Sequence, residues 1–387
     1  MINSSWVDKQ LSEVCTEITS GGAAPQGDKY FINGSHPFVR VVDMGKLSHE
    51  KYLAKTRDVL NESGVSKLRE FPSGTILFTK SGASLLLNQR AILKIPMYVV
   101  SHIGCLIPND CVTSDWLYYW MKIVDFGKYA HATTLPSLKL STLKELTIPV
   151  PPLEEQKRIV ARIEELFSEL DAAEKDLNLV KKKLLQYRRA VVKEALTPAL
   201  HPEIQWTETV IENVCDCLDS RRKPVKKSER SSGSGIYPYY GANGITGMID
   251  DYLFDEELVL VVEDETFVGR VKPFSYIIRG KSWVNNHAHI LRGKDGIITN
   301  EYLNYLLSYY PFLPLTTGTT GRKKLTKKAL MNAPIHVAEY KHQSTIVSEI
   351  ESRLSVCDKI EETVNTALQE AEAMRQSILK QAFAGEL

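Results

Sequence analysis

The side chains best suited to binding a polyanion lie in a basic run, RRKPVKKSER, which begins at Arg221 and leads through SSGSG into YPYYGANG. Lys and Arg neutralise phosphates, whereas polar and aromatic side chains reach the bases. The pattern predicts a basic loop that enters a DNA groove, and the alternative is a solvated surface loop. The residues predicted to contact DNA here are Arg221, Arg222, Lys223, Lys226, Lys227, Tyr239, Tyr240 and Asn243.

Two further groups of polar residues have the types that contact DNA. GTTGRKKLTKK is a second cationic run, and TTLPSLKL is its counterpart in the first part of the chain. A turn-rich segment at residues 80–90 adds a Gln and an Arg, which can pair bidentately with adenine and guanine. The predicted residues are Arg322, Lys323, Lys324, Ser137, Lys139, Lys80, Ser81, Gln89 and Arg90. The alternative for the two runs is helix-start capping.

The residues that could ligate a metal or catalyse a reaction are not grouped by spacing. His287 and His289 share a strand face, but no carboxylate or third histidine is spaced to complete a metal site, so we expect structural or DNA-facing residues. Glu263 and its acidic neighbours resemble a nuclease cluster without the following ExK pair, which favours a turn. No phosphate loop, HExxH, triad motif or Asn-Pro-Pro-Tyr occurs. We predict no catalytic residue and no metal in this chain; an enzyme with an unfamiliar site remains the alternative.

The composition is that of an ordinary globular protein. Hydrophobic residues make up 43% of the 387 residues, and no apolar run approaches the roughly 18 residues that a membrane helix needs. The six cysteines lack CxxC spacing, which favours buried thiols in a reducing cytoplasm. With no leader pattern at the N-terminus, we expect a cytoplasmic protein without a membrane partner. Because the net charge is only +1, a DNA-binding surface requires local clustering of cations.

An internal duplication organises the chain. IVARIEELFSELDAAE, which begins at Ile159, aligns with IVSEIESRLSVCDKIE, which begins at Ile346. The same offset pairs Gln156 with Gln343 and Arg188 with Arg375, and WVDKQLSEVC near the start resembles WTETVIENVC, which begins at Trp206. The chain is therefore a tandem repeat of a variable block followed by a helix.

Each repeat ends in an apolar stripe with the spacing of a coiled coil. In the first stripe, apolar residues recur at intervals of four and three from Ile159 to Val191, and the segment between Pro152 and Pro198 contains no Gly or Pro. The second stripe runs from Ile346 to Ile378 and is interrupted by Arg353. We expect the two helices to pack against each other as an antiparallel coiled coil. The alternative is that each helix pairs with a separate partner chain.

The blocks before the helices have a mixed pattern. Short β-rich runs alternate with Gly, Pro and Asn turns, and each block has one amphipathic helix, DWLYYWMKI or EYLNYLLSYY. The predicted fold class is α/β (α+β), with two globular domains separated by two long helices. The predicted domains are a first block at 1–150, a central helix at 151–200, a second block at 201–337 and a C-terminal helix at 338–387.

Long motifs in a fixed order carry a resemblance to a known family. LPSLKLSTLKELTIPVP followed by PPLEEQKRIVARIEELFSELD is similar to the central junction of type I restriction-modification specificity subunits. A divergent second copy, LTKKALMNAPIHVAEYKHQSTIVSEIESRL, and the ending LKQAFAGEL also resemble that family. In the second block, YYGANGITGMIDDYLFDEELVLVVED and WVNNHAHIL are similar to a common family type, and the first block matches through PFVRVVDM and FPSGTILFTKSG.

The resemblance implies a non-catalytic, DNA-reading function. Each block is a target-recognition domain for one half of a bipartite double-stranded DNA site, and the helices set the half-site separation. The helices also dock two copies of a methyltransferase subunit, which binds S-adenosylmethionine, flips an adenine and methylates N6. This chain itself holds no cofactor, and a translocating endonuclease subunit adds restriction. The alternatives are a coiled-coil scaffold that links two protein-binding domains without DNA, and a self-sufficient DNA enzyme.

Overall fold

The computed structural model describes residues 6–45, 50–130, 136–226, 235–265, 267–318 and 323–387. The chain forms two compact units. Unit 1 comprises Met1–Lys175 and Leu368–Leu387, and unit 2 comprises Asp176–Ala367. Two long helices, α6 (Leu153–Ala195) and α10 (Tyr340–Ala384), contribute to both units, so each unit contains one variable block and one part of each helix. None of the described helices is long and apolar enough to cross a membrane.

The block of unit 1 contains two sheets and a separate strand pair. The sheet orders are β2-β10-β7-β8-β4 and β5-β3-β9-β6, and β1 pairs with β11. The strands are β1 (Val7–Gln10), β2 (Cys15–Ser20), β3 (His36–Val39), β4 (Tyr52–Leu53), β5 (Asp58–Leu60), β6 (Glu70–Phe71), β7 (Ile76–Thr79), β8 (Arg90–Leu93), β9 (Met97–Val99), β10 (Ile103–Pro108) and β11 (Thr147–Val150). The helices are α1 (Leu11–Val14), α2 (Val41–Met44), α3 (Glu62–Val65), α4 (Ser114–Ile123) and α5 (Leu140–Lys144), with 3-10 turns η1 (Asp28–Tyr30), η2 (Ala83–Leu87) and η3 (Phe126–Lys128).

The block of unit 2 repeats this plan. Its sheet orders are β13-β21-β17-β19 and β15-β14-β20-β16, with the short pairs β12-β23 and β18-β22. The strands are β12 (Trp206–Val210), β13 (Cys215–Cys217), β14 (Tyr237–Gly241), β15 (Gly244–Ile249), β16 (Phe254–Asp255), β17 (Leu258–Val262), β18 (Asp264–Glu265), β19 (Ser275–Ile278), β20 (Lys281–Val284), β21 (Ala288–Gly293), β22 (Lys323–Lys324) and β23 (Pro334–Ala338). The helices are α7 (Ile211–Val214), α8 (Asn300–Ser308) and α9 (Lys327–Met331), with 3-10 turns η4 (Pro198–Leu200), η5 (Asp219–Arg221) and η7 (Leu313–Leu315).

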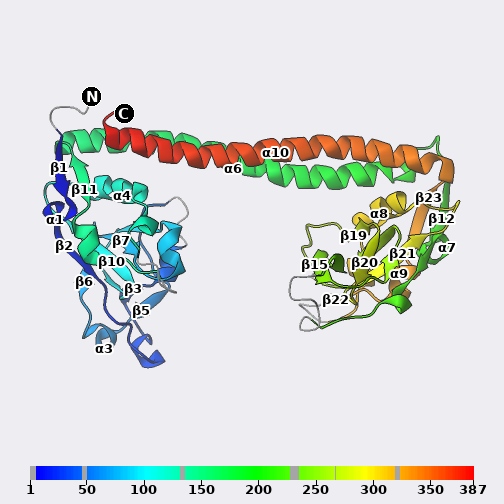
Figure 1. The fold of residues 1–387 in the computed structure, drawn as a ribbon, viewed down its shortest axis with the longest axis horizontal. Coiled ribbons are helices and arrows are strands. Elements are labelled where there is room, and N and C mark those ends of the chain that lie inside the picture. Colours follow the sequence, from blue (N-terminus) through cyan, green and yellow to red (C-terminus); the bar gives the residue numbers. More distant parts are fainter. Residues whose placement is uncertain (1–5, 46–49, 131–135, 227–234, 266, 319–322) are drawn as a thin grey trace. The chain divides into compact units, whose positions relative to one another are not determined.

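The amphipathic helix of each block lies between the sheets and the long helices, as Figure 1 shows for α4 and α8. In unit 1, Trp116 of α4 is fully buried and packs 4.3 Å, centroid to centroid, from Phe383 of α10. In unit 2, the fully buried Tyr302 of α8 belongs to the same core as Val192 and Ile350 of the long helices. In each unit, the block and the adjoining parts of α6 and α10 thus form one hydrophobic core. This core fixes the position of the block on the helices of its own unit.

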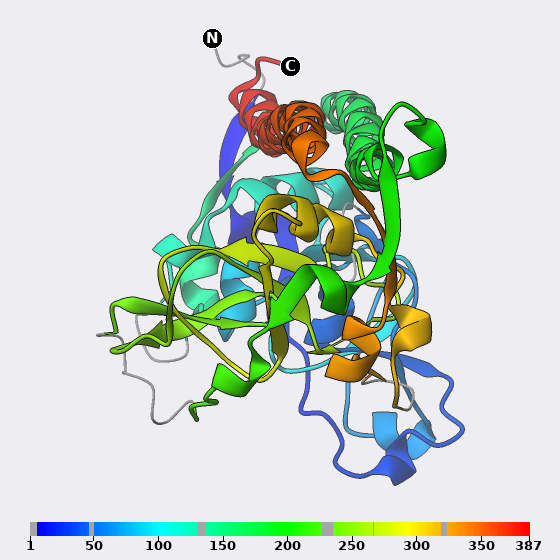
Figure 2. The same cartoon turned by 90° about the vertical axis from the view of Figure 1, so that its right-hand side faces the viewer.

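A glutamine at the start of each long helix ties the block to that helix. Gln156 accepts a hydrogen bond from the backbone N of Thr113, the N-cap of α4, and its amide donates to the carbonyls of Cys111 and Pro151. Gln343, which is also fully buried, accepts from the N of Thr299 and donates to Ile297 and Ala338. The duplication therefore preserves a complete three-bond junction. In Figure 2, the antiparallel pair of β12 (green) and β23 (orange) connects the same junction to the sheets of unit 2.

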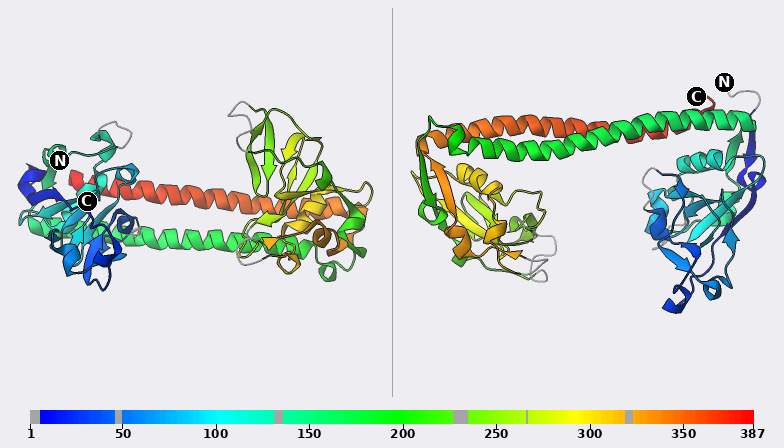
Figure 3. Two further views of the ribbon diagram at one scale, coloured as in Figure 1. Left: turned by 90° about the horizontal axis from the view of Figure 1, so that it is seen from below. Right: turned by 180° about the vertical axis from the view of Figure 1, so that it is seen from behind.

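The two long helices pair antiparallel, as expected from the sequence. In unit 1, Arg375 of α10 contacts Asp171 and Glu174 of α6, and in unit 2, Arg188 of α6 contacts Asp358 and Glu361 of α10. Each repeat provides the arginine of one triad and the acids of the other, which requires opposite helix directions. Figure 3 shows α6 and α10 side by side in two views.

The heptad stripe is only partly buried. Ile159, Ile163 and Ile350 are in the core, whereas Ile360 and Met374 are exposed. Within unit 1, the buried side chain next to Met374 is Arg375, because an α-helix drifts relative to a strict seven-residue repeat. In unit 2, Arg353 does not leave a gap in the stripe, since it pairs with Glu194 and lies over the ring of Tyr187.

Candidate nucleic-acid interface

In unit 2, the start of the basic run is part of a buried network of charges. Arg222 contacts Asp219 of η5 and Glu263, which follows β17, and it also donates to the carbonyl of Ala288. Lys324 of β22 reaches Glu263 at 3.0 Å, and β22 pairs with β18 next to it. The network therefore joins the two predicted cationic segments of this block to the ends of its central strands.

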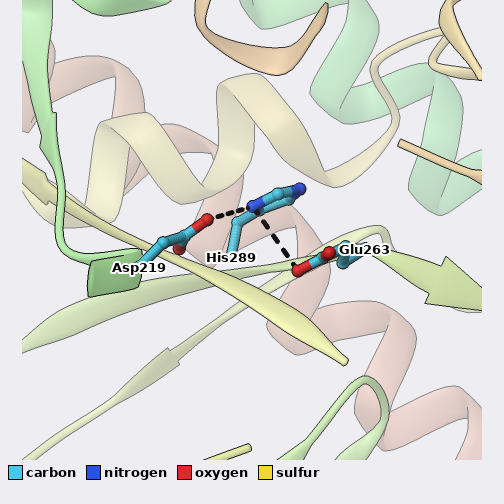
Figure 4. Close-up of side chains that lie close together, drawn as sticks. All are labelled: Asp219, Glu263 and His289. Atoms are coloured by element: carbon cyan, nitrogen blue, oxygen red, sulfur yellow. Dashed lines mark hydrogen bonds and ion pairs between the residues drawn. The ribbon is translucent and has the colours of Figure 1, made fainter. Parts of the chain in front are cut away.

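His289 of β21 completes this network, and its side chain is only 1% exposed. Its Nδ1 lies 2.6 Å from Asp219 and its Nε2 lies 2.8 Å from the carbonyl oxygen of Leu325. A carbonyl and a carboxylate are both hydrogen-bond acceptors, so each ring nitrogen of His289 faces an acceptor. Figure 4 shows His289 between Asp219 and Glu263.

The pKa values of the two acids reflect these contacts. Burial by itself raises the pKa of Asp219, but the hydrogen bond and charge of His289, the backbone N of Ile290 and Arg222 together hold it below its ordinary value. Burial likewise raises the pKa of Glu263, and contacts with Arg222, Lys324 and His289 lower it overall. Both carboxylates are therefore ionised at neutral pH and balance the buried cations.

Asp219, Glu263 and His289 also have the side-chain types of a metal site, since their ligand atoms lie within 4.8 Å of one another. Sequence spacing could not link these carboxylates to His289, because Asp219 comes from a distant turn and Glu263 from the end of a neighbouring strand. Glu263 is also more than a turn residue, because it is buried and paired. Two cations, Arg222 and Lys324, already compensate the carboxylates, so the arrangement is that of a structural charge network.

The exposed part of the basic run is anchored through its backbone. The carbonyl of Lys223 accepts from Nε1 of Trp283 at 2.6 Å, and the N of Val225 donates to the hydroxyl of Tyr239 at 3.1 Å. The side chains of Lys223 and Lys226 are exposed and face solvent. The side chain of Arg221 is about half exposed, lies over the ring of Phe254 and contacts Glu256. These three residues are the cations of the run that remain accessible in the described part of unit 2.

In unit 1, two of the predicted segments, around Lys80 and around Ser137, lie against each other. The N of Leu138 donates to the carbonyl of Lys80, and Ser81 and Ser137 form a β-bridge. Ser81 also lies 3.1 Å from Nδ1 of His102, while Ser137 and Lys139 are exposed. The same contact occurs in unit 2, where the N of Leu325 donates to the carbonyl of Glu263. Each block therefore has a strap, residues 136–139 or 323–325, against the end of its central strand β7 or β17.

Comparison with known proteins supplies the family. The profile of the type I restriction modification DNA specificity domain matches residues 3–182 and 203–370. This chain belongs to that family. A putative type I restriction enzyme specificity subunit from Haemophilus influenzae is 35% identical over 39% of this chain and 37% of its own length, and the MjaIX specificity subunit from Methanocaldococcus jannaschii is 30% identical over 47% and 42%. The chain thus matches about two fifths of the length of these relatives. The StySPI specificity subunit from Salmonella potsdam is 23% identical over 99% of this chain and 89% of its own length.

Two solved structures share the fold of this specificity-family chain. A chain from work on the assembly and conformational transition of the type I R-M system has a TM-score of 0.72, with 18% identity and full coverage of both chains. The HsdS subunit from Thermoanaerobacter tengcongensis has a TM-score of 0.53, with 18% identity over 100% of this chain and 98% of its own. At this identity, the likeness shows the fold alone, and it agrees with the mixed α/β blocks and long helices described above.

Two residues predicted to touch DNA are inside the fold of this specificity-family chain. Tyr239 is fully buried and its hydroxyl anchors Val225, while Arg90 is 3% exposed behind η2. Neither side chain can reach DNA in this structure, so both predictions are corrected. Arg222 and Lys324 serve the buried network, although Lys324 keeps half of its surface open. Lys227 and Arg322 lie outside the described residues.

The remaining predicted residues have polar surroundings in the specificity-family fold. Asn243 is exposed and accepts from Arg270 at 2.9 Å, Tyr240 is half-buried near Tyr276, and Gln89 and Lys323 are half-buried. Arg270 was missed by sequence reasoning because it lies outside the basic runs. The two junction glutamines were paired by the repeat, but only the structure shows that they accept from the backbone N of Thr113 and Thr299, the N-cap residues of α4 and α8.

Proposed function

We propose that this chain is the DNA-specificity subunit of a type I restriction-modification complex and has no catalytic site of its own. Each block reads one half of a bipartite double-stranded DNA site, and α6 and α10 set the half-site separation, on the order of one DNA turn. The observation that supports this most strongly is the duplication itself. Two blocks with the same strand plan and the same glutamine junction, but different surface residues, suit a reader of two different sequences.

We further propose that the complex contains two copies of a methyltransferase subunit, one for each repeat. That partner, rather than this chain, binds S-adenosylmethionine and methylates adenine N6 after base flipping. A translocating endonuclease subunit provides restriction, and the assembly works in the cytoplasm. The exposed Lys223 and Lys226, mounted on a backbone anchored to Trp283 and Tyr239, are the proposed phosphate contacts of unit 2. In unit 1 the corresponding candidates are Lys80, Ser137 and Lys139.

The decisive experiment is modified-base sequencing of genomic DNA from cells with and without this chain, with the methyltransferase subunit present in both. We expect a split motif with N6-methyladenine on both strands that disappears when the chain is absent. Unchanged methylation, together with no salt-sensitive DNA binding by the complex, would favour the scaffold alternative. Methylation by the purified chain alone would instead favour a self-sufficient enzyme.

A second experiment tests the assignment of the basic run. Replacing both Lys223 and Lys226 with Ala should weaken DNA binding at all sequences. It should also reduce the slope of log K against log salt concentration by about 1 for each phosphate that is no longer neutralised. The matched control is Lys175→Ala with Lys182→Ala on α6, which removes the same charge away from the block. An equal effect of both pairs would mean that only the net charge matters.

A further inference from the structure

A hollow in unit 2 lies between the last turns of α6 and the end of α8. It has a volume of about 400 Å³, and the described residues that line it all belong to unit 2. Apolar and aromatic side chains form most of its wall, and no aspartate or glutamate is among these described residues. The wall residues that carry the argument are Arg189, Val192, Lys193, Leu196, Tyr305 and Tyr309.

The walls of the hollow are held in place by contacts within unit 2. The hydroxyl of Tyr310, which also lines the hollow, donates to the carbonyl of Pro334 at 2.9 Å. Arg189 donates to the backbone carbonyls of residues 270 and 271, and its guanidinium lies over the ring of Tyr309. Because side chains that are already ordered lose little further entropy on binding, the hollow suits recognition of a partner without rearrangement.

The other repeat shows what kind of side chain fits at this place. The offset that pairs Gln156 with Gln343 also pairs Leu196 with Phe383. In unit 1 the ring of Phe383 packs against Trp116, whereas unit 2 has the shorter Leu196 at the wall of the hollow. Unit 2 thus lacks an aromatic ring that unit 1 supplies from its own chain, and a large apolar side chain of a partner can take that place.

The hollow of unit 2 is also larger than the equivalent space of unit 1. The residues of unit 1 that correspond to Arg189, Val192 and Tyr305 line a cavity of about 120 Å³, compared with about 400 Å³ in unit 2. The wall of the smaller cavity includes an acid, Glu372. The corresponding residues are Gln376, Leu379 and Tyr119. The two units therefore offer a partner different surfaces between the long helix and the amphipathic helix.

The rim of the hollow is cationic. Lys193 is exposed and makes no ion pair within the described part of unit 2, and Arg189 contacts two carbonyls and a ring rather than a carboxylate. Tyrosine and arginine around an apolar hollow are typical of protein interfaces, whereas surfaces that bind DNA are more polar and more strongly cationic. The hollow therefore favours a protein segment that carries an apolar side chain next to a carboxylate.

We infer that a protein partner inserts a large apolar side chain into this hollow, with an adjacent carboxylate facing Lys193 and Arg189. The partner is the methyltransferase subunit, an identification that rests on the proposed function. Because the equivalent cavity of unit 1 is small and includes an acid, the hollow holds only the copy that docks on unit 2. The two copies are therefore held by different contacts, although the repeat that mounts them is the same.

The test fills the hollow with the residue that the other repeat has. Leu196→Phe in the full chain should raise the dissociation constant of the purified methyltransferase subunit for unit 2 roughly tenfold or more, since an anchor pocket is no longer open. At concentrations between the two dissociation constants, native mass spectrometry should show one bound copy instead of two. The unfolding temperature of the free variant should be unchanged or higher, because the added ring fills a cavity. The control is Leu313→Phe, at an exposed leucine that does not line the hollow, and it should leave both copies bound.

A charge variant keeps the test valid if Leu196→Phe does not fold. Lys193→Glu changes an exposed rim residue and should weaken the binding of one copy several-fold, with a larger effect at low salt concentration. The matched control is Lys182→Glu, which reverses an exposed charge on α6 away from the hollow and should leave the binding unchanged.

The outcomes separate this inference from the proposed function. Two copies bound with unchanged affinity in both variants would overturn the inference, as would an equal loss of both copies or a loss that only parallels a loss of stability. Weaker DNA binding with normal assembly would also overturn it and would assign the hollow to DNA. If the unaltered chain binds no methyltransferase subunit, the proposed function fails and the assignment of the partner fails with it.

Discussion

The central strands β7 of unit 1 and β17 of unit 2 end in equivalent backbone contacts, but the side chains around these two strand ends differ. Leu138 in unit 1 and Leu325 in unit 2 make equivalent strap contacts, so Lys80 stands where unit 2 has Glu263. The pairing of β7 with β10 and of β17 with β21 then places Gly104 where unit 2 has His289.

Different side chains fill this equivalent space. In unit 1 the ring of Phe78 covers Gly104, and an added Cβ would lie 2.1 Å from Phe78 Cζ. In unit 2 the same space holds the imidazole of His289 with its two carboxylates. The two units therefore share the glutamine junction and the strap. They differ in the side chains that fill this space, which are aromatic in unit 1 and charged in unit 2. Unit 2 therefore depends on paired charges inside the fold, while unit 1 leaves Arg90 and Lys122 without ion pairs among its described residues.

The largest effect that tests this difference is expected from Asp219→Ala. The substitution removes the acceptor of His289, Arg222 and the N of Ile290, and should cost about 3–5 kcal/mol because a buried cation loses its partner. Denaturant unfolding of the full chain measures the change. Asp216→Ala, which removes an exposed partner of Arg292, is the control and should cost less than about 1 kcal/mol. A small cost for Asp219→Ala would mean that the buried network does not depend on this carboxylate.

The next largest loss of stability is expected at the glutamine junction, which both units have. Gln156→Ala and Gln343→Ala each remove three hydrogen bonds in a buried junction, so each should cost about 2–3 kcal/mol. The two losses should be equal within error if the duplication preserves the energetics as well as the geometry. A clear inequality, measured by denaturant unfolding, would show that one unit has compensating contacts at its junction.

Much of the structure that the two units have in common could be predicted from the sequence. Much of what differs between the two units could not. The helices around Trp116 and Tyr302 and the long helices follow from periodicity, and α6 ends close to Pro198, as predicted. Local pattern decides such elements, because an apolar face or a proline acts within a few residues. The repeat also pointed to Gln156 and Gln343, although not to their hydrogen bonds.

The candidate site was less predictable because its residues are distant in sequence. Asp219, Glu263 and His289 meet only through the sheet order, so no spacing in the sequence links them. The burial of Arg90 and Tyr239 was missed for a related reason. A basic or aromatic residue in such a segment looks accessible until the packing of η2 and η3 around Arg90, and of Val225 against the hydroxyl of Tyr239, is known.

A third prediction addresses the aromatic filling of unit 1. Gly104→Ala should cost about 1–3 kcal/mol, since its Cβ would overlap Phe78 in a closely packed core. Ser20→Ala, directly opposite on β2, is the control and should change the unfolding free energy by less than about 0.5 kcal/mol. Tolerance of Gly104→Ala would show that Phe78 can move and that this part of unit 1 is loosely packed.

The charged filling of unit 2 predicts a pH dependence that the aromatic filling of Phe78 over Gly104 in unit 1 does not contribute. Because the folded-state pKa values of Asp219 and Glu263 lie below their ordinary values of 3.8 and 4.5, their contribution is fully present above about pH 5. It is lost as the pH falls through the lower folded-state values. Unfolding midpoints between pH 6 and pH 3 should therefore fall less steeply in Glu263→Gln than in the unaltered chain. Parallel curves would mean that Glu263 contributes no proton linkage.

The smallest expected effect compares the two arginine triads of the long helices. The Arg375 side chain is 6% exposed and that of Arg188 is 17% exposed, although each contacts two equivalent acids. Arg375→Ala should cost about 1–2 kcal/mol, because it also removes a contact over the ring of Phe167, and Arg188→Ala should cost less than about 1 kcal/mol. Raising the salt concentration should reduce the cost of Arg188→Ala more, since the better-exposed triad is screened. Equal costs and equal salt sensitivity would show that the helix pairing, unlike the two blocks, has stayed symmetric in energy as well as in sequence.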